Sequence, residues 1–257
     1  MGTNYSLNKN QDFLEKRFEA KFDRDFESVY HVSAYDNPSM PVITNEETDK
    51  FSFLNWGLIP SWVSDEEQAR DIRIKTVNAR SDTIFEKSSF RVPIRKRRCL
   101  VVMDGYFEWR EVNGRIYPYY IKMKDNDAFA VAGVWDEWND RKNKKKLRTY
   151  SVISIDANPF IARVNNKKKR MPVILPKKDE RKWIQSNIGE EHIKLMLKTY
   201  EGKDLEAHPV RQLITKGGAD SNVPEVLEKY DYDGLRSLDE KTQNQRDFKQ
   251  STLLRRT

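Results

Sequence analysis

The sequence has one cysteine, Cys99, and three histidines among its 257 residues. A single cysteine excludes an intramolecular disulfide and a cysteine-based zinc site, which needs several thiolates. His31, His192 and His208 do not have the spacing of metal ligands. With only 10 glycines, the chain also has no glycine-rich phosphate loop and no nucleophile elbow. We therefore expect no metal and no other cofactor.

Long apolar runs are absent as well. No stretch approaches the ~20 apolar residues that cross a bilayer, and the first residues lack the apolar segment of a secretory signal. We therefore expect a cytoplasmic monomer without a membrane partner, associated with the nucleoid when it is bound to DNA. The net charge of +7 favours a polyanionic partner, although a basic surface that serves only solubility is an alternative.

What the sequence does have is a series of short strand patterns. The unbroken apolar run Cys99–Met103 predicts a buried strand that ends at Asp104-Gly105. Asn113-Gly114 is a two-residue hairpin turn. Further strands are predicted at Pro41–Ile43, Phe51–Leu54, Tyr106–Trp109, Tyr117–Ile121, Phe129–Trp135, Thr149–Ser154 and Val173–Leu175.

Helical spacing of apolar residues appears in two places, Asp12–Phe22 and Asp179–Leu197. Strands joined by hairpins, with few crossover helices, predict an α+β fold in which a β-rich, barrel-like, twisted antiparallel sheet is flanked by helices. We expect one domain over residues 1–232. Residues 233–257 are polar and lack a core pattern, so a flexible tail is expected there.

Glu108 is a candidate for acid and base chemistry. It follows Tyr106 and Phe107 and precedes Trp109 in a predicted strand, which places a carboxylate among aromatic rings. Burial of this kind raises a carboxylate pKa and suits proton transfer near neutral pH. The alternative is a surface carboxylate paired with a basic side chain.

Several segments have the residue types that contact single-stranded nucleic acid. Asn78-Ala79-Arg80-Ser81 combines an amide, a guanidinium and a hydroxyl, which can hold phosphate and sugar oxygens. Trp56 and Trp62 can stack on unpaired bases, or they can belong to the core. The basic runs 95–98 and 167–170 can follow a phosphate backbone, or they can be solvated loops.

Taken in chain order, these segments resemble the SOS response-associated peptidase (SRAP) family over residues 1–232. The motifs that carry the resemblance are Trp56–Trp62, Asn78–Ser81, Arg98–Trp109, Phe129–Trp135, Asp156–Pro159 and Arg170–Leu175. The resemblance implies a compact barrel with a positive cleft for single-stranded or abasic-site DNA. It also implies a cysteine after the initiator methionine, whose amine and thiol close a thiazolidine ring with the sugar aldehyde and which is the proposed peptidase nucleophile.

This chain departs from the family pattern at two positions of the proposed chemistry, and also at Thr3 and Asn4, which stand where the family has Gly and Arg after the cysteine. Gly2 stands at the cysteine position, and Asn165 stands at the position of the family histidine. Glycine has no thiol to close the ring, and an amide cannot shuttle protons near neutral pH. His31 is a candidate substitute base, or simply a packing residue.

The other family positions match. By resemblance, Glu108 assists sugar ring opening and proton transfer. The positions that resemble the family's DNA contacts are Asn78, Arg80, Ser81, Trp56, Trp62, Arg170, Met171 and Pro172. The main hypothesis is therefore a protein that binds single-stranded or abasic DNA in the DNA damage response and is impaired in stable crosslinking. The alternatives are an imine-forming lyase that uses the Gly2 amine, and a non-enzymatic scaffold.

Overall fold

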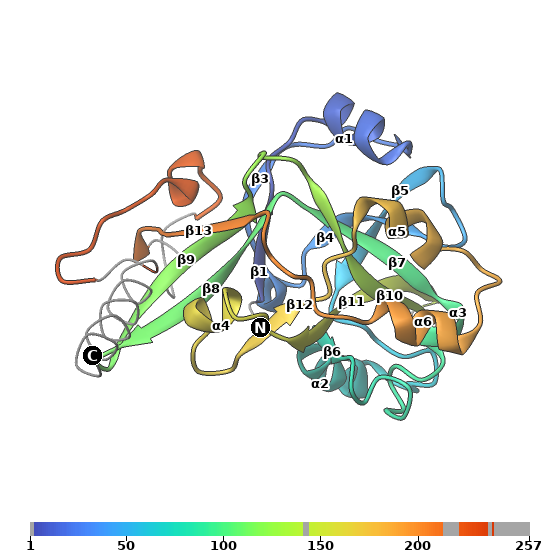
Figure 1. The fold of residues 1–257 in the computed structure, drawn as a ribbon. Coiled ribbons are helices and arrows are strands. Elements are labelled where there is room, and N and C mark those ends of the chain that lie inside the picture. The colour runs from blue at the N-terminus through green and yellow to red at the C-terminus, as the bar shows by residue number, and fades with distance from the viewer. Residues whose placement is uncertain (1–2, 141–143, 213–220, 236–237, 239–257) are drawn as a thin grey trace, which may run out of the picture.

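The computed structural model describes residues 3–140, 144–212, 221–235 and 238, which form two β-sheets with short helices around them (Figure 1). The strands are β1 (Asn4–Leu7), β2 (Lys21–Phe22), β3 (Val29–Ser33), β4 (Ser39–Thr44), β5 (Lys50–Trp56), β6 (Asn78–Arg80), β7 (Arg98–Met103), β8 (Gly105–Val112), β9 (Arg115–Met123), β10 (Phe129–Asp140), β11 (Lys145–Asp156), β12 (Arg170–Pro172) and β13 (Leu205–Pro209). The helices are α1 (Gln11–Phe18), α2 (Glu66–Lys75), α3 (Pro93–Lys96), α4 (Ile161–Val164), α5 (Lys177–Trp183) and α6 (Glu190–Met196), with 3₁₀ turns η1 (Ala34–Asp36) and η3 (Pro224–Leu227).

The larger sheet closes on itself. Its strands run β11-β10-β7-β4-β5, and β5 returns to β11 where Asn55 and Trp56 pair with Thr149 and Tyr150. Because each of these five strands has a neighbour on both sides, the ring leaves no open edge. The predicted barrel-like α+β fold is confirmed. The β5–β11 and β6–β11 pairings are parallel, while neighbouring strands of the hairpins are antiparallel.

The second sheet has the order β13-β9-β8-β1-β3. The predicted hairpin turn joins β8 to β9, where Asn113 (φ 51°) and Gly114 (φ 76°) both adopt the left-handed conformation that a two-residue turn requires. Strand β1 lies between β3 and β8, with Tyr5 opposite both Val32 and Tyr106. The N-terminal segment is therefore held in the interior of a sheet.

Strand β7 is buried along its whole length, as its apolar run predicted. Helix α5 packs beside it, and the Trp183 indole N–H donates to the Cys99 carbonyl oxygen at 3.0 Å. Arg98 begins β7 and is also buried, and its guanidinium donates to the carbonyl oxygens of Trp183 and Gln185. Arg98 therefore joins α5 to the barrel, and its charge is not available to a phosphate.

Two helix predictions are wrong in their extent. The first helix ends at Phe18 because Glu19 turns into the left-handed region (φ 51°), and Phe22 belongs to β2 instead. The helix predicted over Asp179–Leu197 is two helices, α5 and α6. Arg98 takes up carbonyl groups at the end of α5, so these carbonyls do not continue the helical hydrogen bonding.

Two further predictions concern the second half of the chain. The strand predicted at Val173–Leu175 has other bounds in the structure. Strand β12 covers Arg170–Pro172, and Ile174 makes a single bridge to Val131. Most of the tail predicted at 233–257 lies outside the described residues.

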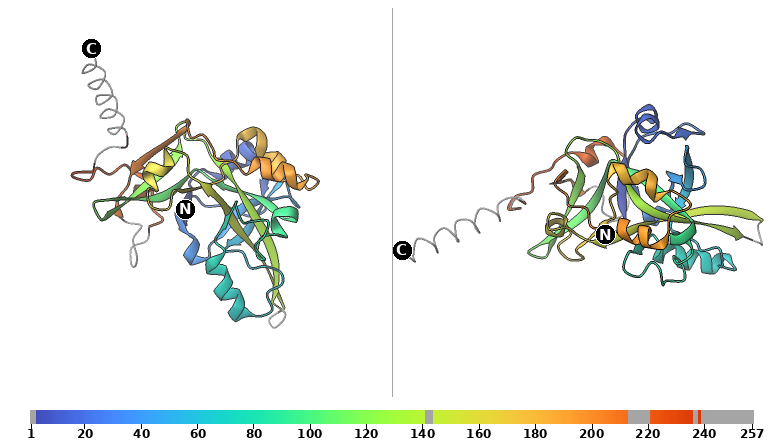
Figure 2. Two further views of the ribbon diagram at one scale, coloured as in Figure 1. Left: turned by 60° about the horizontal axis from the view of Figure 1, so that its bottom comes forward. Right: turned by 45° about the vertical axis from the view of Figure 1, so that its right-hand side comes forward.

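Strands β10 and β11 extend beyond the barrel as a long hairpin (Figure 2). Within the described part of the chain, no helix is both long and apolar enough to cross a membrane.

Candidate functional site

A cavity of about 640 Å³ opens beside the second sheet, where β1, β8 and the loop after α4 meet. Figure 1 shows α4 next to β8 and β12. Residues that line this cavity, called here the main cavity, are Thr3, Tyr35, Glu108, Trp109, Glu111, Ile116, Asn165, Lys167, Lys168 and Gln212. The structure therefore brings together the N-terminal segment, Glu108 and Asn165, three places that the family resemblance selected. Gly2 itself lies outside the described residues.

Glu108 lies in the middle of the β8–β9 hairpin, opposite Tyr119. Its side chain is only 3% exposed although it lines the main cavity. Tyr106 is two residues earlier in β8, so its side chain is on the same face of the strand. Burial raises the pKa of the Tyr106 phenol well above its ordinary value, and the negative charge of Glu108 raises this pKa further. The Glu108 carboxyl group therefore lines the main cavity, and the neutral Tyr106 phenol on the same face of the strand lines a separate small cavity.

Two of the buried polar atoms without a hydrogen-bond partner among the described residues belong to Asn78 and Tyr106. They are the Tyr106 hydroxyl and the Asn78 amide oxygen, both buried. Asn78 in β6 pairs with Val152, and Val152 and Tyr106 line one small cavity with Asn4. Buried polar groups are nearly always paired with protein, water or ligand.

Asn165 follows α4 and is buried. Its side-chain N–H donates to the Arg170 carbonyl oxygen at 2.9 Å, and its side-chain oxygen accepts from the Lys168 backbone N–H at 3.4 Å. The Lys169 N–H donates to its backbone carbonyl at 2.8 Å. Asn165 therefore fixes the shape of the basic loop 165–170 and places Lys167 and Lys168 at the main cavity.

Arg80, Ser81 and Arg170 converge on one position of the barrel, Ser154. Arg80 lies opposite Ser154 in the β6–β11 ladder, and the Ser81 N–H donates to the Ser154 carbonyl oxygen at 2.9 Å. The Arg170 guanidinium donates to the same oxygen at 2.7 Å and to the Asp156 carboxylate at 2.7 Å. Asn165 connects this group to the main cavity, because it bonds to the backbone of Arg170.

The charges of this group are partly neutralised within the chain. Arg80 forms an ion pair with Asp82, and this pairing, together with the charge of Arg170, lowers the pKa of the Asp82 carboxyl. Arg170 pairs with Asp156, a carboxylate exposed to solvent. A phosphate that binds to Arg80 or Arg170 must displace the carboxylate from the guanidinium, or bind to the same guanidinium together with it. Arg80 is itself exposed and can turn toward solvent.

The predicted base-stacking residues differ in exposure. Trp56 is 2% exposed, stacks against Tyr150 and donates its indole N–H to the Val77 carbonyl oxygen at 2.8 Å. It is therefore a core residue whose ring faces are covered by protein. Trp62 is 51% exposed and offers a ring to solvent. Met171 is fully buried and Pro172 is also buried, so both serve packing.

His31 holds the N-terminal strand in place and does not line the main cavity. One ring nitrogen contacts the Asn4 side-chain oxygen at 3.0 Å, and the other contacts the Ser221 hydroxyl. Burial lowers the pKa of His31 from its usual 6.5 to about 4, so the ring is neutral at pH 7. Its contacts are those of a packing residue.

Sequence reasoning missed several residues of the main cavity. Tyr35 in η1 and Ile116 in β9 line it, and so does Gln212, far along the chain. None of them belongs to a motif or has a spacing that distinguishes it. They reach the cavity because β1 and β3 pair and because β8 and β9 form a hairpin. The basic run 167–170 was the one signal that pointed to this side of the cavity.

Known proteins share this fold. A crystal structure of a protein from Bacteroides thetaiotaomicron superposes with a TM-score of 0.84 at 36% identity, and the match covers 89% of this chain and 99% of that one. A protein from Bordetella bronchiseptica, 23% identical, matches with a TM-score of 0.71 over 81% of this chain and 99% of that one. The second likeness concerns the fold alone.

Sequence relatives carry informative names. The abasic site processing protein YoqW of Bacillus subtilis is 32% identical over 209 residues, which are 79% of this chain and 89% of that protein. The abasic site processing protein HMCES of Mus musculus is 32% identical over 203 residues, which are 68% of this chain and 55% of that protein. The family model described as SOS response associated peptidase (SRAP) matches residues 1–217.

Fold and site together define a class: a closed β-barrel joined to a second sheet, in which an N-terminal strand, a buried carboxylate and a basic loop surround one cavity. The family match and the sequence relatives then identify the family within that class. The chain belongs to the SOS response-associated peptidase (SRAP) family.

Proposed function

We propose that this protein binds single-stranded DNA at abasic sites in the DNA damage response and does not form the stable thiazolidine crosslink that the family resemblance implies. The observation that carries the proposal is the main cavity, where Thr3, Glu108 and Asn165 lie beside Lys167 and Lys168. Relatives named abasic site processing proteins support the substrate class.

Phosphates on either side of the lesion have cations available. Lys167 and Lys168 line the main cavity, and Arg80 and Arg170 lie next to Ser154. Lysine and arginine that neutralise phosphates release counterions, so this binding weakens as salt is added. Trp62 provides an exposed ring for an unpaired base. The sugar of the lesion then reaches Glu108.

The crosslink is expected to be missing because Gly2 has no thiol. Without sulfur, attack on the sugar aldehyde ends at an imine, which water reverses. The side chain of Asn165 is occupied with the loop 165–170 and has no titratable proton near neutral pH. Neither residue therefore supplies what a ring closure needs.

The second candidate function is an imine-forming abasic-site lyase. One observation favours it: Thr3, the residue after Gly2, lines the main cavity with Glu108. After removal of Met1, the Gly2 amine, whose pKa is about 8 in an ordinary chain terminus, attacks the aldehyde carbon of the opened sugar. A C=N bond replaces the C=O bond, and the carbonyl oxygen leaves as water with the two amine hydrogens. Glu108 carries a proton from the amine nitrogen to the departing oxygen.

One experiment tests the main proposal. The purified protein is incubated with a single-stranded abasic oligonucleotide and with the intact oligonucleotide, and binding is followed at several salt concentrations. A denaturing gel then reports any heat-stable adduct. We expect salt-dependent binding that is tighter with the abasic strand, and no heat-stable adduct. Equal binding to both strands, or abundant heat-stable adduct, contradicts the proposal.

The matched control is the double variant Gly2→Cys with Asn165→His, which restores both family positions. We expect this variant to form a heat-stable adduct on the same abasic strand. Borohydride reduction separates the second candidate, because it traps an imine as a stable amine. If mass spectrometry shows that Met1 is removed and no trapped species forms, the lyase candidate fails while the binding proposal stands.

A further inference from the structure

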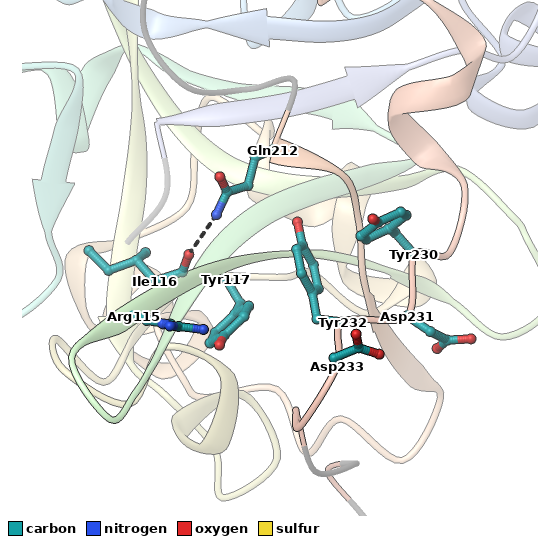
Figure 3. Close-up of a pocket in the computed structure, with 8 residues that line it drawn as sticks. All are labelled: Arg115, Ile116, Tyr117, Gln212, Tyr230, Asp231, Tyr232 and Asp233. Atoms are coloured by element: carbon teal, nitrogen blue, oxygen red, sulfur yellow. Dashed lines mark hydrogen bonds between the residues drawn. The ribbon is translucent and has the colours of Figure 1, made fainter.

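A second cavity of about 560 Å³ lies next to the main cavity (Figure 3). It is called here the tyrosine cavity, and the residues that line it are Arg115, Ile116, Tyr117, Gln212, Tyr230, Asp231, Tyr232 and Asp233. Ile116 and Gln212 line both cavities, and the Gln212 side-chain N–H donates to the Ile116 carbonyl oxygen at 3.4 Å. The two cavities therefore adjoin each other at Ile116 and Gln212.

Three aromatic rings form one side of the tyrosine cavity. The centroids of Tyr117 and Tyr232 are 5.0 Å apart, and those of Tyr230 and Tyr232 are 4.7 Å apart, both pairs edge to face. Figure 3 shows the three rings along the pocket. The Tyr232 hydroxyl donates to the Val210 carbonyl oxygen at 2.8 Å, which fixes the central ring. Rings held in this way lose little conformational freedom when a flat ligand stacks on them.

Tyr230 is the most accessible of the three rings, with 38% of its surface exposed. The Arg211 guanidinium lies 5.2 Å from the centroid of its ring. A planar, partly exposed ring next to guanidinium groups is the arrangement on which single-stranded nucleic acids stack their bases. Arg115, on the β9 side of the same cavity, adds a cation that a phosphate can use.

The remaining polar groups of the tyrosine cavity are carboxylates and one amide. Asp231 forms an ion pair with Lys229 at 2.9 Å, and Asp233 is two residues further along. Carboxylate oxygens accept hydrogen bonds from the exocyclic amino groups of cytosine, adenine and guanine. Thymine has no exocyclic amine, and its one donor, the N3–H, lies between two carbonyl oxygens that a carboxylate repels. The lining thus favours an amino-bearing base.

We infer that the tyrosine cavity is a subsite for the unpaired base next to the abasic site, and that it prefers an amino-bearing base to thymine. This inference rests on the proposed function, because the lesion in the main cavity is what places its neighbour at Ile116 and Gln212. Residues 230–233 lie beyond residues 1–217, which the family model matches. Four of the eight residues that line the subsite therefore lie outside the stretch that the family model matches, and the other four lie within it.

The test combines one variant with a set of abasic oligonucleotides. The neighbours of the lesion, on one side and then the other, are cytosine, thymine or a second baseless sugar. We expect the protein to bind the cytosine strand at least about fivefold more tightly than the baseless strand, the size of one stacked base. We expect the affinity for the thymine strand to lie between the affinities for these two strands. With Tyr230→Ala, we expect the cytosine and baseless strands to bind within about twofold of each other.

Two controls make the result specific. Tyr230→Phe keeps the ring and is expected to keep the preference for cytosine. Phe13→Ala removes a similarly exposed ring, 39% exposed, from α1, which lines neither cavity, and is expected to change nothing. Far-ultraviolet circular dichroism of each variant shows whether it is folded. If Tyr230→Ala does not fold, the neighbour preference of the unmodified protein together with Asp233→Asn still tests the subsite.

The outcomes separate the two proposals. If the protein binds the abasic strands but is indifferent to the neighbouring base on both sides, the subsite is overturned and the proposed function stands. If no abasic strand binds, both are overturned. Aromatic rings with carboxylates also bind organic cations. Quenching of tyrosine fluorescence by tetramethylammonium and not by cytidine monophosphate would overturn the subsite in favour of a cation pocket.

Discussion

Two buried carboxylates, one just before strand β8 and one in its middle, have different surroundings. Asp104, just before the strand, accepts hydrogen bonds from the Ser6 hydroxyl at 2.5 Å, from the Tyr120 hydroxyl at 3.3 Å and from the backbone N–H groups of Asn8 and Lys9. Glu108 lines the main cavity next to the unpaired Tyr106 hydroxyl. Burial alone therefore does not distinguish a structural carboxylate from a functional one.

The comparison shows what does distinguish them. The donors around Asp104 come from β1 and the residues after it and from β9, so this carboxylate fastens the N-terminal strand to the β8–β9 hairpin. Glu108 stands in the middle of the strand and lines the main cavity. One carboxylate holds the first residues of the chain in position, and the other faces the space to which those residues lead.

The largest expected effect is the loss of stability on Asp104→Ala. Removing this acceptor takes away the carboxylate that accepts from the Asn8 and Lys9 backbone N–H groups and one partner of the Ser6 and Tyr120 hydroxyls, and we expect the free energy of unfolding to fall by about 3 kcal/mol. Urea unfolding followed by circular dichroism measures this change. Asp25→Ala, which removes an exposed carboxylate, is the control and is expected to cost under about 0.5 kcal/mol. A similar, small cost for both variants would end the structural interpretation of Asp104.

Glu108→Gln tests the second of the two carboxylates. Because glutamine has the same size and keeps its polar character, we expect the free energy of unfolding to change by less than about 1 kcal/mol. Removing the proton carrier should lower the rate of borohydride-trapped adduct formation about 100-fold. The control is Glu111→Gln, a carboxylate of the same cavity that pairs with Lys167. A trapping rate that falls equally in both variants would show that Glu108 has no special role.

His31 sharpens the comparison by its dependence on pH. Burial lowers its pKa from 6.5 to about 4, while the charge of Asp36 acts in the opposite direction. Between these two pH values the unfolded chain binds more protons than the folded protein, so stability falls as the pH falls from 6.5 to about 4. In His31→Gln we expect a shallower loss over this interval. Unfolding midpoints measured at several pH values check it, and parallel slopes in the two proteins would speak against it.

The smallest expected effect concerns Lys168, at the edge of the main cavity. If it neutralises one phosphate, Lys168→Ala lowers the slope of log binding constant against log salt by about 1 and weakens binding to every strand alike. Lys178→Ala on α5, which does not line either cavity, should leave the slope unchanged. Titrations at four or more salt concentrations measure the slopes, and equal slopes for both variants would remove Lys168 from the site.

Part of this site could be predicted from the sequence, and part could not. Glu108, Asn165 and the basic run 167–170 were selected from residue types and motif resemblance, and they meet at one cavity. Trp56 and Trp62 belong to the same motif, and sequence did not tell which of them is buried. Only the packing of Trp56 against Tyr150 and Tyr5 decides that.

The helices show the same limit. Helical spacing continues through 179–197, yet α5 ends at Trp183 because Arg98, far away in the chain, binds the carbonyl oxygens of Trp183 and Gln185. The tyrosine cavity was not foreseen at all. Its rings come from β9 and from residues 230–232, which have no local pattern in common.

The sequence by itself determined the local elements of this protein: the buried strand β7, the Asn113-Gly114 turn and the absence of a thiol beside the N-terminus. Side-chain periodicity and turn geometry act over a few residues, so they can be seen in a linear chain. Only the tertiary structure decided that β1 lies between β3 and β8, and that β5 returns to β11. Which polar groups share a cavity follows from that strand order, because pairing between distant segments depends on the packing of the whole domain and not on local propensity.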